Sequence, residues 1–137
     1  MRASKLACCQ AGRHRARRRW STSRAPLLPH HKLVAYGVSV ELLLAVKAAN
    51  IRDAELRDEA VRAAKGTCLN CAEGAGGVTR ADKARVFAIA RGEAVEAFAA
   101  VEITALAGDT TKQAVDRCVV IGDRLVARLA RLTGLIR

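Results

Sequence analysis

Residues 70–92 read NCAEGAGGVTRADKARVFAIARG, and this stretch decides the fold. Glu73 is expected to close one helix, and the three glycines that follow it within four residues are expected to supply the positive φ angles with which helices often end. Thr79 then stands where an N-cap belongs, three residues before Asp82, at the spacing of a capping box. The stretch therefore predicts two helices folded back on each other, joined by a glycine-rich corner.

The same stretch resembles the signature of a known family. The resemblance rests on an Asn-x-Ala-Glu-Gly element and on later positions at fixed spacing, which here are Asn70, Ala72, Glu73, Gly74, Thr79, Asp82, Phe87, Ala90, Arg91 and Gly92. In these positions the chain is similar to the four-helix-bundle proteins encoded by intervening sequences of bacterial large-subunit ribosomal RNA genes. The likeness covers roughly residues 33–132 and is strongest from 70 to about 109. It implies a helical bundle without catalytic activity, often a homopentamer.

Composition leads to the same fold class without the resemblance. The chain has 137 residues, enough for one domain, and 51% of them are hydrophobic although only 3% are aromatic. A core built from Ala, Val and Leu favours helices. Its two prolines, Pro26 and Pro29, precede the region where helices are expected, and no alternating strand pattern persists. We therefore predict an all-α protein.

Charge divides the chain into two parts. Residues 1–32 carry nine basic side chains and no acidic one, whereas the whole chain has a net charge of +11, so residues 33–137 carry only +2. Such a basic segment is expected to be disordered, because it repels itself and has little to bury. We therefore predict a basic N-terminal extension, residues 1–32, followed by a four-helix bundle over residues 33–137.

Three interpretations of the extension stay open. It fits the product of a translation start placed too early in GC-rich DNA, a genuine RNA-binding arm, or a segment with the composition of a transit peptide. Its apolar pieces are too short for a signal peptide, and no uncharged run approaches the ~18 residues of a transmembrane helix. We expect a soluble, cytoplasmic protein that is not attached to a membrane.

Four helices are expected after the extension, over residues 33–50, 53–73, 80–107 and 110–133. The short turns between the first and second helix and between the third and fourth imply antiparallel neighbours in an up-down-up-down bundle. The inward positions are expected to be Leu33, Tyr36, Val40, Leu43 or Leu44, and Lys47 or Ala48 in the first helix; Leu56, Ala60, Ala63 or Ala64, Thr67 and Cys71 in the second; Val86, Phe87, Ala90, Ala94, Phe98, Val101 and Ala105 in the third; and Val115, Val119, Gly122, Val126, Leu129 and Thr133 in the fourth.

Self-association is expected because a core of small residues buries little area in so short a chain. An apolar strip of Leu42, Ala45 and Ala49 is expected on the outside of the first helix, where a neighbouring subunit would cover it. The alternative is an ordinary surface with a few exposed apolar residues. The resemblance implies a homopentamer.

The cysteines and histidines do not form a recognisable site. Cys68 and Cys71 make a C-x-x-C that lies inside a helix, where we interpret both as small core residues and a redox or metal role as the lesser alternative. All three histidines precede the expected bundle, so no Ser-His or Cys-His pair is available within it. Glu93, Glu96 and Glu102 lack the histidines of a di-metal bundle and are expected to be solvated or paired with arginine. We predict no enzyme, metal, cofactor or small-molecule substrate.

Two groups of residues are candidates for function or register. Arginines recur on one side of the last helix, within about 60° of one another, and are predicted to contact nucleic-acid phosphates or to form an ordinary solvated face: Arg117, Arg124, Arg128 and Arg131. In the motif of Asn70, Glu73 and Arg91, an ion pair from Glu73 to Arg91 is predicted to fix the register of two helices, with ligand binding as the lesser alternative.

The sequence therefore predicts a non-enzymatic, oligomeric bundle that associates with RNA or a ribonucleoprotein as an accessory or scaffold protein. One alternative is a structural bundle that binds no nucleic acid. Another follows from the resemblance, because a related branch of the family serves as a basic accessory subunit of the reverse transcriptases of diversity-generating retroelements. Neighbouring genes discriminate among these: a surrounding ribosomal RNA gene favours the first, and an adjacent reverse transcriptase favours the last.

Overall fold

Four α-helices make up almost all of the part of the chain that the structure describes. The computed structural model describes residues 28–134, in which a 3₁₀ turn, η1 (Pro29–Lys32), precedes α1 (Val34–Ala48), α2 (Ala54–Gly76), α3 (Arg80–Leu106) and α4 (Lys112–Leu132). No strand occurs within these residues. The predicted all-α class and the predicted four helices are therefore confirmed. The disorder expected for the basic extension falls largely on residues 1–27, outside the described residues.

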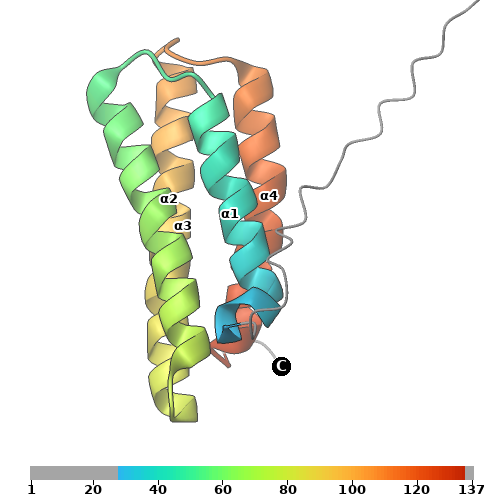
Figure 1. Cartoon of the computed structure of the whole chain (residues 1–137). Helices are drawn as coiled ribbons and strands as arrows, with labels where there is room; N and C mark the ends of the chain where they lie inside the picture. Colours follow the sequence, from blue (N-terminus) through green and yellow to red (C-terminus); the bar gives the residue numbers. More distant parts are fainter. Residues whose placement is uncertain (1–27, 135–137) are drawn as a thin grey trace, which may run out of the picture.

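The helices form one bundle in which each helix packs against the next along the chain, and α4 packs back against α1. Figure 1 shows the four helices side by side and alternating in direction, with the α1–α2 and α3–α4 connections at one end and the α2–α3 connection at the other. The η1 turn contacts α2, although the sequence assigns its four residues to the extension.

Side-chain caps explain where three of the helices begin. The side-chain oxygens of Asp53, Thr79 and Thr111 each accept a hydrogen bond from the backbone N–H three residues later. The cap expected at Thr79 is thereby confirmed. The fourth helix begins at Lys112 rather than near 110, because Thr110 instead donates its hydroxyl to the carbonyl of Ala49 over 2.6 Å.

That Thr110 contact is part of a seam between the two connections at the same end of the bundle. The backbone N–H of Arg52 donates to the carbonyl of Asp109 over 3.0 Å, and its guanidinium reaches the carbonyl of Gly108 and the Asp109 carboxylate. Ile51, between α1 and α2, is buried. The two short connections therefore hold each other in place and fix the end of the bundle.

The glycine-rich corner differs from its prediction. α2 does not end at Glu73 but continues to Gly76, and within the described residues only Gly108 and Gly134 among the glycines have positive φ. Gly74 is a buried helical residue, and a Cβ on it would lie 2.7 Å from the ring of Phe87. Position 74 therefore requires glycine because the ring of Phe87 packs against it, and not because the backbone has a positive φ.

The inward face of α1 also differs from its prediction. Leu42, Ala45 and Ala49, expected to form an outer strip, are almost completely buried, with exposures of 0%, 6% and 5%. Leu44, an alternative for the inward face, is 61% exposed. The reason is that α1 presents apolar residues around its whole circumference, and the small side chains of Ala45 and Ala49 allow the closest approach to the other helices. Leu42, Ala45 and Ala49 therefore carry no subunit contact.

The other three helices follow their predicted faces more closely. All the inward positions predicted on α2 are buried except Leu56, which is half-buried. On α3, Ala97, Ala100 and Thr104 join the predicted residues in the core. On α4, Gly122 and Leu129 are buried as predicted, whereas Val119 is 42% exposed and Cys118 and Leu125 take the central positions.

Gly122 is the tightest position of the α3–α4 contact. A Cβ on this residue would lie 1.2 Å from Cζ of Phe98, so the ring occupies the space that a side chain would need. A phenyl ring packed between two helices cannot move aside for a new side chain without leaving a cavity in the core.

We therefore expect Gly122→Ala to destabilise the bundle by about 3 kcal/mol or more, because α3 and α4 must separate to admit the methyl group. Chemical denaturation followed by circular dichroism measures the effect. Gly37→Ala is the matched control, since a Cβ there meets nothing within 4 Å. That substitution is expected to raise stability by up to about 1 kcal/mol, the gain of replacing an exposed helical glycine. Equal effects of the two substitutions would contradict the packing described here.

Candidate nucleic-acid interface

The four arginines expected to line the last helix do lie together on its outer side. Arg117, Arg124, Arg128 and Arg131 are all exposed residues of α4. We call these four residues the arginine stripe. At 1.5 Å per residue, it extends over about 21 Å of helix. The stripe lies on the side of α4 that faces α1, because Arg117 borders a small hollow together with Ala45 and Ala48 of α1.

Little within the described residues neutralises the stripe. Of the four arginines, only Arg124 contacts a carboxylate among residues 28–134: its Nη1 lies 3.3 Å from Oε2 of Glu41 on α1. The two side chains are 48% and 54% exposed, so the pair contributes at most about 1 kcal/mol and Arg124 can exchange Glu41 for a phosphate at low cost. Asp116, the acid directly before Arg117 in the chain, is paired with Lys112 at 3.6 Å.

The motif residues of α2 and α3 do not form the predicted ion pair. Glu73 is exposed, and within the described residues Arg91 has no carboxylate partner and a buried Nε that makes no hydrogen bond. Residues two apart on a helix point in nearly opposite directions, and Glu93 is the one that faces α2. Arg91 therefore points away from Glu73, and the prediction is wrong. Asn70 donates its side-chain amide to the carbonyl of Gly66 on its own helix.

A different polar contact joins α2 to α3, and its arginine, Arg62, was not singled out from the sequence. Nη2 of Arg62 lies 2.8 Å from Oε1 of Glu96 and also contacts Glu59, which confirms the expected arginine pairing of Glu96. The guanidinium lowers the pKa of Glu59, whereas the hydrogen bond shared with Glu59 raises the pKa of Glu96.

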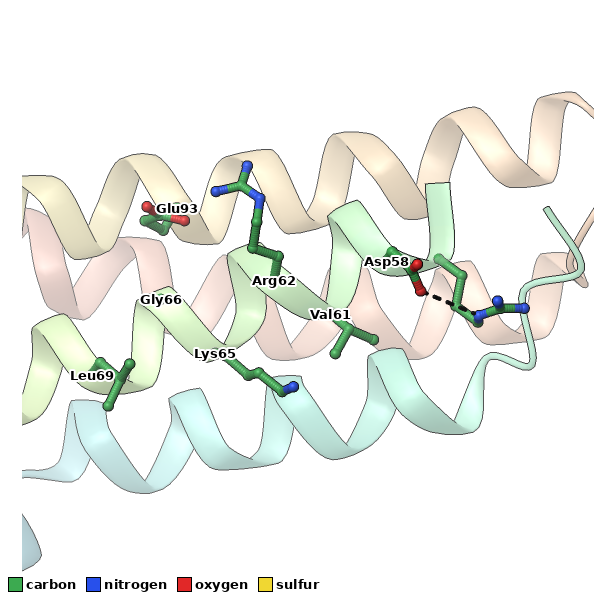
Figure 2. A pocket seen from close by; sticks show the side chains of 8 residues that line it. Asp58, Val61, Arg62, Lys65, Gly66, Leu69 and Glu93 are labelled. Carbon is green, nitrogen blue, oxygen red and sulfur yellow. Dashed lines mark ion pairs between the residues drawn. The ribbon is translucent and has the colours of Figure 1, made fainter. Parts of the chain in front are cut away.

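Glu93 of α3, next to this contact, has one carboxylate oxygen, Oε2, that is buried and has no hydrogen-bond partner within the described residues. A Cβ added to Gly66 of α2 would lie only 2.8 Å from this oxygen, so the carboxylate packs directly over that glycine. Figure 2 shows Glu93 on α3 above Gly66, with Arg62 directed toward α3 and Lys65 toward α1. A spacing rule within one helix could not have identified this contact, because it depends on how closely α2 and α3 approach.

The hollow in Figure 2 has a volume of about 550 Å³ and is bounded mainly by one face of α2. Its charges oppose each other at close range, as in the 3.6 Å contact between Arg57 and Asp58. Its acidic and basic groups therefore neutralise each other instead of converging on a ligand of one charge. The arginine stripe remains the better candidate for a functional surface.

The cysteines in the described part of the chain belong to the packing. Cys71 and Cys118 are buried and Cys68 is half-buried. Burial raises the pKa of all three thiols, that of Cys71 to about 12. Protonated thiols are poor nucleophiles and poor metal ligands. Over residues 28–134, no cluster of three His, Cys, Asp or Glu side chains is arranged to hold a metal ion.

Comparison of the sequence with models of protein families gives no match, and comparison with curated proteins gives none either. Among the helices of residues 28–134, none combines the length and the apolar character needed to cross a membrane.

We expect Cys71 and Cys118 to resist a thiolate-selective reagent in the folded protein and to react as soon as denaturant is added. The measurement is mass spectrometry of a Cys8→Ser/Cys9→Ser variant, in which Cys68 is the half-buried internal comparison. Between the ordinary thiol pKa of about 8.5 and the folded value of about 12, Cys71 ionises only in the unfolded chain. Stability is therefore expected to fall as pH rises through this range. Rapid labelling of Cys71 in the folded state would contradict its burial.

Proposed function

We propose that this protein is a non-enzymatic, self-associating helical bundle that binds structured RNA, alone or in a ribonucleoprotein, through the arginine stripe of α4. The observation that carries the proposal is the alignment of four exposed arginines, three of them without a carboxylate partner among residues 28–134. Guanidinium groups recognise phosphates with two parallel hydrogen bonds, and a row of them follows a phosphate backbone without reading sequence.

The shape of the stripe supports a polyanion rather than a small molecule. A row of charges about 21 Å long on a convex helix has no cavity to enclose a ligand, and it matches an extended partner with repeating charge. The basic residues that precede the bundle would add to the same attraction, because nine positive charges in residues 1–32 raise the local concentration of any nucleic acid. The free thiols of Cys68, Cys71 and Cys118 agree with a partner in a reducing compartment such as the cytoplasm.

The self-association part of the proposal rests on exposed apolar surface away from the stripe. Val95, Ile103 and Leu106 on α3 are 48%, 50% and 89% exposed. Side chains of this kind gathered on one helix are typical of a protein contact. The pentamer implied by the family resemblance is one arrangement that would cover them.

We expect Arg117→Glu/Arg128→Glu/Arg131→Glu to weaken binding of a ribosomal RNA fragment by at least about tenfold and to flatten the dependence of binding on salt, since three phosphate contacts are lost. This variant leaves the Arg124–Glu41 contact intact. Mobility shift over a salt series, using the full chain, measures both effects.

The matched control is Arg57→Glu/Lys65→Glu/Arg80→Glu, which changes net charge by the same amount on exposed positions of α2 and α3. Equal loss in both variants would show that net charge, and not the stripe, determines binding. A shortened chain that begins at Leu28 separates the contribution of the extension. If that chain does not bind and the full chain does, RNA binding belongs to the extension; if neither binds, the structural alternative without nucleic acid is favoured.

A further inference from the structure

The outward face of α3 is apolar along most of its length. It carries six exposed residues without charge, from Ala88 and Gly92 in its first half to Val95, Ala99, Ile103 and Leu106 in its second. Their spacings of four, three, four, four and three place them in one stripe. We call this set the α3 face. Since the opposite side of α3 forms the core, α3 is apolar on both sides, as expected of a helix that is buried all round.

The α3 face differs from the outward faces of its neighbours. α4 presents the arginine stripe, and the outer side of α2 carries charged residues such as Asp58, Arg62 and Lys65. Exposed aliphatic side chains also occur on α4, at Val119 and Val120, but on α3 they continue along one face without a charged residue among them. Large exposed apolar patches on soluble proteins mark protein contacts.

Gly92 gives an independent indication. It lies at the middle of α3, and a Cβ on it would meet nothing within 4 Å. A glycine inside a helix is unfavourable compared with alanine, and nothing within the described part of the chain requires one here. A second helix crossing at this point would explain it, because the missing side chain allows two backbones to approach closely.

Charge along α3 specifies the direction of that second helix. The first half carries Arg80, Lys83, Arg85 and Arg91 against a single acid, and the second half carries Glu93, Glu96 and Glu102 with no basic residue. This order opposes the dipole of the helix, which favours acids at the start and bases at the end. An antiparallel copy of α3 would place each basic half against an acidic half.

We propose that two copies of this chain pair through their α3 faces, with the two α3 helices antiparallel about a two-fold axis near Gly92. Such an axis keeps each edge of the helix against the same edge of its copy. Arg85 and Glu96 lie on the edge nearer α2, so Arg85 of one chain faces Glu96 of the other. Arg91 and Glu102 lie on the edge nearer α4, but an axis near Gly92 leaves them nine residues out of register, about 14 Å along the helix, so they do not pair. A parallel pair would oppose like charges on both edges.

This inference deepens the self-association of the proposed function and is independent of RNA binding. A two-fold contact between identical faces is closed after two subunits. It therefore predicts a dimer instead of the pentamer that the family resemblance implies.

The first test compares two double substitutions in the full chain by light scattering over a dilution series. Val95→Ser/Ile103→Ser is expected to raise the dimer dissociation constant by at least about tenfold, as loss of a central interface residue does. Leu44→Ser/Leu69→Ser is the matched control, since it removes two aliphatic side chains of equal or greater exposure from α1 and α2. The control is expected to leave the dissociation constant unchanged.

The second test exchanges charges. Arg85→Glu and Glu96→Arg are each expected to weaken the dimer, because each opposes like charges on one edge. The double variant Arg85→Glu/Glu96→Arg is expected to recover affinity, since the exchanged pair attracts again. Denaturation of each variant shows whether the bundle itself stays folded, which matters for Glu96 because it also contacts Arg62.

A dimer that dissociates with the α3 substitutions and recovers with the charge exchange supports the proposal. A monomer at all concentrations overturns both this contact and the self-association of the proposed function. An oligomer that tolerates the α3 substitutions overturns the contact alone and leaves self-association through another surface. A dimer weakened by both single charge variants and weakened further by the double variant overturns the antiparallel arrangement.

Discussion

Two phenylalanine rings on α3, each placed over a glycine of a neighbouring helix, determine how the rest of the bundle packs. Phe87 fills the space at Gly74 of α2, and Phe98 fills the space at Gly122 of α4. These are the two phenylalanines of the chain, and the core around them consists mostly of alanine, valine and leucine. The two rings are the largest side chains in this core. Each fits only opposite a glycine, so Gly74 and Gly122 fix the axial register of α2 and α4 against α3. The short connections follow from that register, and the Arg52–Asp109 contact then closes one end.

Local signals in the sequence were sufficient for the fold class and for the helix starts. Composition predicted helices, and the caps at Asp53 and Thr79 are formed because an N-cap depends only on residues within one turn. The end of α2 was not predictable in the same way. A glycine near the end of a helix usually provides a positive φ, but Gly74 is needed for a ring thirteen residues further along the chain. Nothing in the neighbourhood of residue 74 distinguishes these two uses.

The same contrast between local and distant causes separates the predictable from the unpredictable parts of the candidate site. The arginine stripe follows from helical spacing alone, and its residues lie together as expected. The orientation of Arg91 depends on which side of α3 faces α2, and that side is marked by Glu93 and its contact with Gly66. For α1, apolar residues on every side left the spacing pattern without a unique solution. Its buried face was decided instead by the small side chains of Ala45 and Ala49, which permit close helix contact.

The two surfaces left by this packing lie on different sides of the bundle, and this separation bears on how the protein works. The arginine stripe is on the α1 side of α4, as the Arg124–Glu41 contact shows, whereas the α3 face points away from both α1 and the core. A charged row needs an aqueous surface to reach a polyanion, and an aliphatic face needs a dry one. Placing them on different helices allows both conditions to be met at once. If two chains pair through α3, both stripes stay exposed on the outside of the pair, and a folded RNA that meets two such rows gains affinity from their linkage without any new contact.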